Sequence, residues 1–161
     1  MNPIHGTLLA IHIAPRRAAP MEARQAIRVI PGQGLEGDRY ALGKGGLSRW
    51  GGPHREVTLI AREDLDRMAE AGVMLPAIES RRNLLVEGVE LEALLKREFW
   101  IGDVPFRGMQ RCQPCKYLMR VTGRDDLLPA MVGRGGLRAR VLTDGVVRVG
   151  DRIGEAPATS R

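Results

Sequence analysis

The two cysteines of the chain stand three positions apart, in a segment that also carries two cationic side chains. Arg111 precedes Cys112, and Lys116 follows Cys115. A free thiol has a pKa of about 8.5, and nearby Arg or Lys charge lowers it. The segment therefore favours a thiolate that accepts sulfur or binds a soft metal. Cys115 is the predicted reactive residue, and Cys112 is either a second thiol of the site or a buried apolar residue.

Two further motifs could bind an anion. Asp38 and Arg39 lie together in a turn, where the acid either orients the arginine towards an anion or forms a weak surface ion pair. Arg81, Arg82 and Asn83 immediately precede an apolar strand. Two guanidinium groups followed by an amide form a donor array that suits an oxyanion, and the alternative is a pair of exposed arginines in a turn.

The histidines give a weaker indication. His54, at the start of a strand, is the histidine that most readily suggests a functional role, although a solvated loop residue is the alternative. His12, inside an apolar strand, is expected to be a hydrogen-bonded core or edge residue. Cys112 and Cys115 have the spacing of half a zinc site, but the histidines lack the spacing of the other half, so a structural zinc is not expected.

Composition indicates one mainly β domain of the cytoplasm. The chain has 161 residues, with 20 Gly and 10 Pro but only 4% aromatic residues, which favours many turns between short strands. We expect the domain to span residues 1–154, with a flexible tail at 155–161. Two cysteines are too few for a secreted disulfide framework. The sequence shows neither a signal peptide nor a membrane-spanning run, so no membrane association is expected.

The charge favours an anionic partner. The formal net charge is +6, and only three of the 25 basic residues are lysines. Arginine suits phosphate and carboxylate geometry. A nucleic-acid binder would add aromatic residues among clustered basic ones, and here the aromatic residues are few and scattered. Nucleic acid is therefore not the expected partner.

The pattern of apolar residues predicts which strands, turns and helices carry the candidate site residues. We expect a hairpin that delivers the cysteine segment, and a second hairpin in which Thr143, Asp144 and Gly145 form the turn. A helix with apolar residues at helical spacing should end at Gly72. The expected strands are 6–14, 26–30, 56–60, 84–86, 99–103, 104–109, 133–142 and 146–149, the expected helix is 61–71, and 125–132 is a candidate short helix.

Several motifs carry a family resemblance through their order and spacing. They are Gly37-Asp38-Arg39, Arg55–Ile60, Arg81-Arg82-Asn83-Leu84, Gly88, Gly102, Pro114-Cys115, Arg134–Val141 and Gly150-Asp151. Together they resemble the MOSC domain, named for the C-terminal domain of molybdenum cofactor sulfurase, in its stand-alone bacterial form. The resemblance spans most of the chain and implies an antiparallel β-barrel with peripheral helices.

The resemblance also implies a role with the molybdenum cofactor (molybdopterin). Cys115 matches the family cysteine, which carries sulfur as a persulfide or binds molybdenum, and Cys112 is an additional thiol that could resolve a persulfide. Tyr40 stands where many members have a histidine. The basic residues that would hold the pterin phosphate are Arg81, Arg82 and Asn83, which match the Arg-Arg-Asn motif, Arg134 of the Arg-Gly-Gly motif, and also Arg39, Arg111, Lys116 and His54.

The implied activity is sulfur transfer or the reduction of N-hydroxylated compounds. Larger relatives carry a pyridoxal-phosphate desulfurase domain, for which this chain has no room. A cysteine desulfurase or another sulfur donor would therefore act from outside, and reduction would need an electron-transfer partner. Two alternatives remain open: a basic nucleic-acid or anion-binding module whose cysteines are incidental, and a dithiol redox protein that interconverts Cys112 and Cys115.

Overall fold

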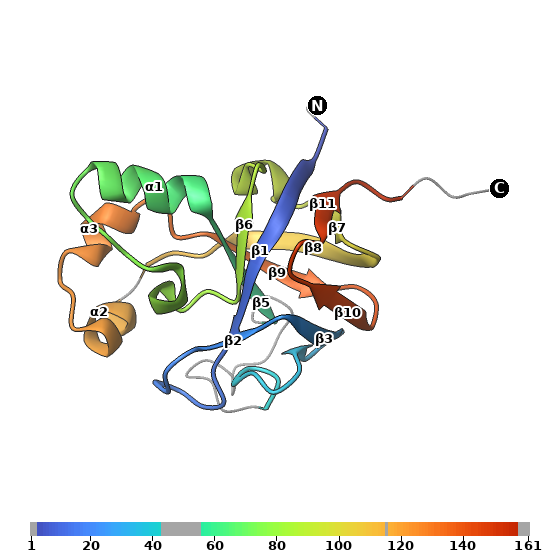
Figure 1. Ribbon diagram of the computed structural model, residues 1–161, viewed down its shortest axis with the longest axis horizontal. Coiled ribbons are helices and arrows are strands. Elements are labelled where there is room, and N and C mark those ends of the chain that lie inside the picture. The colour runs from blue at the N-terminus through green and yellow to red at the C-terminus, as the bar shows by residue number, and fades with distance from the viewer. Residues whose placement is uncertain (1–2, 43–55, 115, 158–161) are drawn as a thin grey trace.

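The computed structural model describes residues 3–42, 56–114 and 116–157. Strands dominate this part of the chain (Figure 1). In order, its elements are β1 (His5–Ile13), β2 (Glu22–Arg24), β3 (Ala26–Ile30), β4 (Gly34–Leu35), β5 (Val57–Ala61), α1 (Arg62–Glu70), η3 (Ala77–Ser80), β6 (Leu84–Glu87), η4 (Leu91–Leu94), β7 (Glu98–Ile101), β8 (Val104–Arg111), α2 (Lys116–Thr122), α3 (Leu127–Met131), β9 (Leu137–Val141), β10 (Gly145–Arg148) and β11 (Arg152–Gly154).

Seven of the strands close into a barrel. Their order is β11, β7, β8, β9, β5, β6 and β1, and β1 pairs back to β11. The last strand closes the ring, because Ile153 pairs with Gly6 of β1 and with Ile101 of β7. The short strand β2 extends the sheet beyond β1. The predicted mainly β class and barrel are confirmed.

One strand pair makes the barrel mixed rather than purely antiparallel. β5 and β6 run parallel, with Leu59 opposite Leu84. Parallel neighbours need a crossover connection, and α1 with η3 supplies it between these two strands. The crossover places α1 on the outer face of β5. All five residues of β5 are buried. Val57, Leu59 and Ala61 belong to the cluster inside the barrel, and Ile60 packs in the cluster under the helices. Thr58 is hydrogen-bonded to Asn83.

The hairpin predicted around Thr143, Asp144 and Gly145 is wrong. β10 pairs with β3, not with β9, and Val147 lies opposite Ile27 in a separate small sheet of β10, β3 and β4. The physical reason is that β9 has no vacant edge, since β8 and β5 already occupy its two sides. The chain therefore leaves the barrel after β9.

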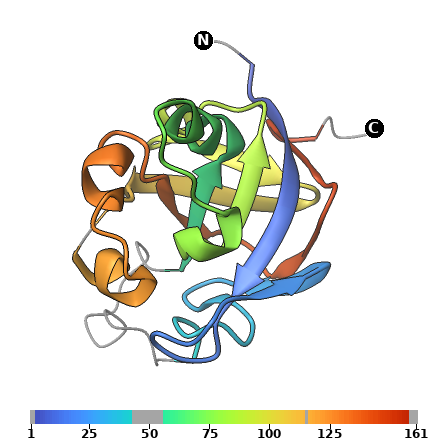
Figure 2. The same ribbon diagram turned by 60° about the vertical axis from the view of Figure 1, so that its left-hand side comes forward.

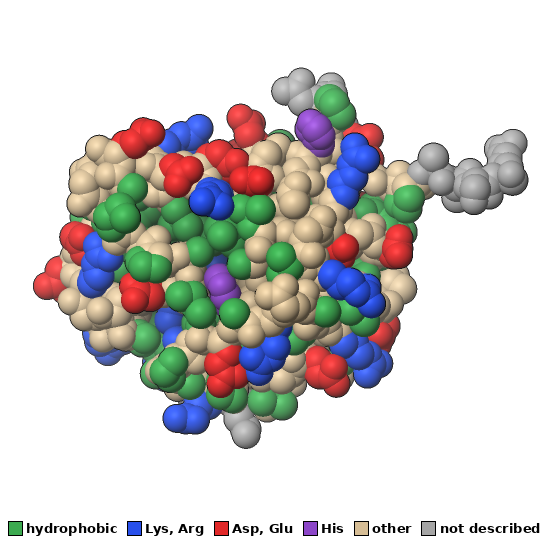
Figure 3. Space-filling model, in the orientation of Figure 1, with side chains coloured by type: hydrophobic (Ala, Val, Ile, Leu, Met, Phe, Trp, Pro, Cys, Tyr) green, Lys and Arg blue, Asp and Glu red, His purple; other side chains and the backbone are tan. Residues whose placement is uncertain are grey.

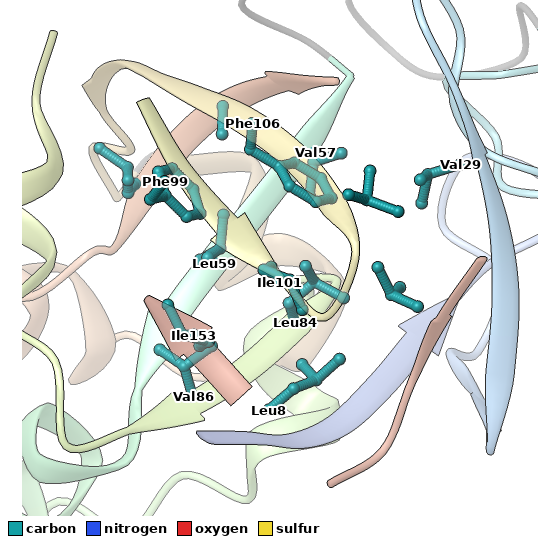
Figure 4. Packing of buried hydrophobic residues seen from close by; sticks show 14 of the residues in the cluster. Leu8, Val29, Val57, Leu59, Leu84, Val86, Phe99, Ile101, Phe106 and Ile153 are labelled. Atoms are coloured by element: carbon teal, nitrogen blue, oxygen red, sulfur yellow. The ribbon is translucent and has the colours of Figure 1, made fainter. Parts of the chain in front are cut away.

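Apolar side chains form two clusters. The larger one fills the barrel, where the rings of Phe99 and Phe106 stack with centroids 5.7 Å apart (Figure 4). The smaller cluster lies under the helices and includes Met68 of α1, Leu118 of α2 and Leu127 of α3. The three helices lie on one side of the barrel (Figures 1 and 2). None of the helices in the described ranges has the length and apolar character needed to span a membrane.

Candidate functional site

The Asp38–Arg39 turn is buried. Asp38 is fully buried and its Oδ1 accepts hydrogen bonds from the Ala14 backbone N at 3.0 Å and from Arg39 Nη1 at 3.2 Å. Arg39 Nη2 also donates to the Arg81 carbonyl oxygen at 3.4 Å. The surface ion pair considered from the sequence is therefore wrong. Asp38 orients the guanidinium group of Arg39, which is only 4% exposed.

Arg81 and Arg82 are buried as well, with 6% and 8% of their surface exposed. Arg81 donates from Nη1 to the Ala19 carbonyl oxygen. Arg82 donates from Nε to the Gly135 carbonyl oxygen at 2.7 Å. The alternative of two exposed arginines in a turn is therefore wrong. These bonds connect the start of β6 to the loop after β1 and to the Arg-Gly-Gly motif.

Several guanidinium nitrogens around these residues are buried and have no hydrogen-bond partner among the described residues. They are Arg81 Nε and Nη2, Arg82 Nη2 and Arg138 Nη1. A buried charged donor that lacks a partner is costly. Burial, and next the positive charge of Arg39, lower the pKa of Arg81. The group of arginines is therefore short of negative charge.

These arginines line one pocket of about 420 Å³, which we call the arginine pocket. Aromatic rings accompany the cations: the guanidinium carbon of Arg39 lies 4.6 Å from the Tyr40 ring centroid, and that of Arg17 lies 4.7 Å from the Tyr117 ring centroid. The described lining residues are Arg17, Arg39, Tyr40, Thr58, Arg81, Arg82, Gln110, Arg111, Cys112, Gln113, Pro114, Tyr117, Leu118 and Arg138.

The cysteine segment forms another wall of the arginine pocket. Cys112 is 2% exposed, and its backbone N donates to the Gly136 carbonyl oxygen at 2.8 Å. Cys115 and His54 lie outside the described residues, so their predicted roles stay predictions. Pro114, which precedes Cys115 in the sequence, lines the pocket.

Asn83 does not line the pocket. It is fully buried, its Oδ1 accepts from Thr58 N and Oγ1 at 3.1 Å each, and its Nδ2 donates to the His12 carbonyl oxygen at 3.1 Å. These bonds join β6 to β5 and β1. Asn83 therefore has a structural role: it links β6, at whose start Arg81 and Arg82 lie, to β5 and β1.

Three other predicted basic residues are arranged differently. Arg111 lines the pocket, but its exposed guanidinium group forms a two-point ion pair with Glu92, which lowers the pKa of that carboxyl group. Lys116 is exposed at the first residue of α2, and neither Lys116 nor Arg134 is among the described lining residues. Arg134 lies near Asp64 instead. Burial raises the pKa of Asp64, and the positive charges of Arg67 and Arg134 oppose this rise only in part. The predicted effect of Arg111 and Lys116 on a thiol pKa stays a prediction.

The glycines of the Arg-Gly-Gly motif have a role that sequence reasoning missed. A Cβ on Gly135 would lie 2.0 Å from the Cys112 carbonyl oxygen, and a Cβ on Gly136 would lie 2.0 Å from the Leu59 carbonyl oxygen. Only residues without a side chain allow these three backbone segments to meet. Arg138 was also missed, although the alternation of arginine and apolar residues along its strand was the available signal.

His12 should make the folding stability of the chain depend on pH. Burial lowers its pKa from the usual value, and a hydrogen bond with the Arg82 backbone opposes this only in part. As the pH falls below about 6.5, His12 is therefore protonated in the unfolded chain before it is protonated in the folded chain. His12 should then lower the free energy of unfolding by at most about 1.4 kcal/mol for each pH unit. Urea unfolding at pH values about half a unit apart, between pH 7.5 and pH 5, would measure this decrease.

The matched variants are His12→Gln and His5→Gln, because His5 is exposed. His12→Gln should flatten this pH dependence, and His5→Gln should leave it as in the wild type. An equal slope in the wild type and His12→Gln would assign the pH dependence to other groups.

In the described ranges, no group of three or more His, Cys, Asp or Glu side chains is arranged to hold a metal ion. Basic and acidic side chains are interspersed on the face seen in Figure 3 rather than gathered in one basic surface.

Solved structures share this fold. The chain is similar to the YuaD protein from Bacillus subtilis, with a TM-score of 0.75 and 18% identity over 94% of this chain and 96% of that chain. It is also similar to YiiM from Geobacillus stearothermophilus, with a TM-score of 0.72 and 17% identity over 92% and 74% of the two chains. YiiM from Escherichia coli gives a TM-score of 0.67 and 18% identity over 96% and 72%.

Sequence comparison gives the family. A search of curated proteins found no match. The sequence model of the MOSC domain matches residues 47–154, which is more than half of the chain. The barrel, the motifs and this match agree, and the chain belongs to the MOSC domain family.

Proposed function

We propose that the chain binds the molybdenum cofactor in the arginine pocket and uses Cys115 to carry sulfur or to hold the metal. The observation that carries the proposal is the set of buried guanidinium nitrogens of Arg81, Arg82 and Arg138 that have no partner among the described residues. Guanidinium groups form strong paired hydrogen bonds with phosphate. The described residues therefore fit an anionic cofactor such as a pterin phosphate.

Each group has a distinct task in this proposal. Arg81, Arg82 and Arg138 would bind the phosphate, and Asp38 would hold Arg39 beside them. Tyr40 and Tyr117, which line the pocket, would contact the planar part of the ligand. When bound, the cofactor would supply a metal centre for oxygen-atom or sulfur chemistry, with N-hydroxylated compounds as the substrates of a reduction and a separate protein as the electron donor.

Sulfur transfer needs no net oxidation or reduction. The thiolate of Cys115 would attack the outer sulfur of a persulfide on a cysteine desulfurase, whose own pyridoxal phosphate generates that persulfide. The sulfur–sulfur bond of the donor would break, the donor cysteine would leave as a thiolate, and a persulfide would remain on Cys115. The thiol of Cys112 could then release the sulfur as hydrosulfide by forming a disulfide with Cys115.

The cofactor role is tested by purification from a host that makes the molybdenum cofactor. Bound molybdenum and the fluorescence of the oxidised pterin would be measured per chain. Arg138→Gln should reduce retention about tenfold or more, since a hydrogen bond to a charged group contributes about 1.5–3 kcal/mol. Its guanidinium group makes no hydrogen bond with the described residues, so the fold should persist. Arg148→Gln, an exposed arginine outside the pocket, is the control.

The sulfur role is tested by mass spectrometry after incubation with a cysteine desulfurase and cysteine. Cys112→Ala should gain one sulfur atom, and Cys115→Ala should gain none. The wild type should gain one sulfur atom or, once Cys112 has released it, lose two hydrogen atoms by forming the disulfide. A wild type that retains no pterin, together with a Cys112→Ala variant that gains no sulfur, would contradict the proposed function. Anion binding that is strong and indifferent to Cys115→Ala would favour a simple anion-binding module.

A further inference from the structure

A second pocket of about 490 Å³ is also bordered by the residues around Cys112. Arg111, Cys112 and Gln113 line this pocket and the arginine pocket alike. We call the second pocket the acidic cleft. Its remaining described lining residues are Ala61, Glu63, Asp64, Arg67, Gly88, Val89, Glu90, Leu91, Glu92, Leu95, Gly133, Gly135, Gly136 and Leu137.

The charge of this cleft is opposite to that of the arginine pocket. Four acidic residues and two arginines line it. Asp64 pairs with Arg67 at 3.3 Å, with Arg134 acting on it as well, and Glu92 pairs with Arg111. Glu63 and Glu90 have no ion pair among the described residues. The cleft therefore keeps two carboxylates whose charge is not matched by a paired cation.

One of these carboxylates is held in place. Glu63 Oε1 accepts a hydrogen bond from the Gly88 backbone N at 2.8 Å, which leaves its other oxygen for a ligand. The apolar residues Val89, Leu91 and Leu137 also line the cleft. An apolar surface with a few placed charges is typical of small-molecule sites.

Cys112 is the independent indication that this cleft and the arginine pocket belong to one centre. Its side chain is almost fully buried, it lines the two cavities, and its Sγ makes no hydrogen bond with the described residues. A molecule in the cleft would thus contact the same segment that borders the arginine pocket.

We propose that the acidic cleft binds an organic cation, a molecule with an apolar body and a protonated amine or guanidine group. Glu63 and Glu90 would neutralise the cation, and the apolar residues would contact its body. The cleft would then be the substrate side of a centre whose cofactor side is the arginine pocket. That last assignment rests on the proposed function, whereas the binding of the cation does not.

The test compares three molecules of similar size and different charge: 2-phenylethylammonium, 2-phenylethanol and 3-phenylpropionate. Each is titrated into the isotope-labelled full chain while backbone amide NMR signals are recorded. The ammonium ion should shift the amides of Gly88, Gly133 and Gly135, which border the cleft. The alcohol should bind more weakly, and the carboxylate should not shift these amides.

Two variants on one helix assign the effect to charge. Glu63→Gln keeps an acceptor for the Gly88 amide and should raise the Kd of the ammonium ion about three- to fivefold, the effect of one exposed ion pair. Glu70→Gln, at the exposed end of α1, should not change it. Equal binding of the ammonium ion and the alcohol, shifts confined to other regions, or no shift at all would overturn the proposal.

A separate titration with pyrophosphate keeps the two proposals distinguishable. Pyrophosphate should shift the amides of Thr58 and Arg81, which border the arginine pocket. If pyrophosphate shifts these amides and the ammonium ion leaves the cleft unchanged, the cation proposal alone is wrong. If the ammonium ion binds and pyrophosphate does not, the cofactor assignment is wrong and the cation site stands.

Discussion

Alanine at Gly136 is expected to remove most of the folding stability of the chain. Gly136 has a φ of 100°, and a Cβ there would lie 2.0 Å from the Leu59 carbonyl oxygen. Leu59 is in the middle of β5, which pairs with β6 and β9, so it has little freedom to move. A left-handed backbone combined with a clash against fixed backbone should cost about 4 kcal/mol or more, out of the roughly 5–15 kcal/mol typical of a domain.

Gly133→Ala is the matched control for this prediction. Gly133 also has a positive φ, 74°, but nothing lies within 4 Å of the position of its Cβ. Its substitution should cost only about 1–2 kcal/mol from the backbone conformation. Urea unfolding of the two variants measures the difference. An equal loss in Gly136→Ala and Gly133→Ala would show that backbone conformation, not the close approach of β5, makes glycine necessary.

Asp38→Asn is expected to lower the free energy of unfolding by about 3–5 kcal/mol, the usual cost of removing one partner of a buried ion pair. The amide keeps the shape and one acceptor, but Arg39 loses its counter-charge while it stays buried beside Arg81. Arg39, Arg81 and Arg82 would then have no carboxylate of the described residues in contact. Chemical denaturation at neutral pH measures the loss.

Asp144→Asn provides the surface counterpart. The Arg28–Asp144 pair is about half exposed, with side-chain exposures of 50% and 46%, so its loss should cost no more than about 1 kcal/mol. Pyrophosphate should recover part of the loss in Asp38→Asn, because a bound anion supplies the missing charge and binding stabilises the folded state. A loss in Asp38→Asn no larger than that in Asp144→Asn would contradict the structural role of the buried pair.

Hydrophobic periodicity predicted most of the strands of the barrel. The strand predicted at 26–30 coincides with β3 (Ala26–Ile30), and the strands around Leu84 and Val104 are confirmed. His12 is buried, as expected for a histidine inside an apolar strand. These predictions succeeded because the burial of one or both faces of a strand determines where apolar residues occur along that strand, and this pattern can be recognised locally in the sequence.

The pairing of the strands was harder to predict from the sequence. The sequence of residues 137–149 is compatible both with a hairpin of two paired strands and with a second strand that pairs elsewhere. The partner of β10 depended on whether β9 had a vacant edge, and that is determined by β5 and β8, which are remote in the sequence. The parallel pairing of β5 and β6 likewise depends on the crossover through α1.

The sequence by itself determined the family and the barrel, and it indicated Arg39, Arg81 and Arg82 as candidate residues of an anion site, because these inferences depend on residue types in a fixed order. Only the tertiary structure decided that Arg39, Arg81 and Arg82 are buried around a pocket that Cys112 also lines. It likewise decided that Asn83 joins strands and that Arg134 lies near Asp64. Burial and charge pairing are sums over contacts between residues far apart in the chain. Those contacts exist only after the barrel has closed.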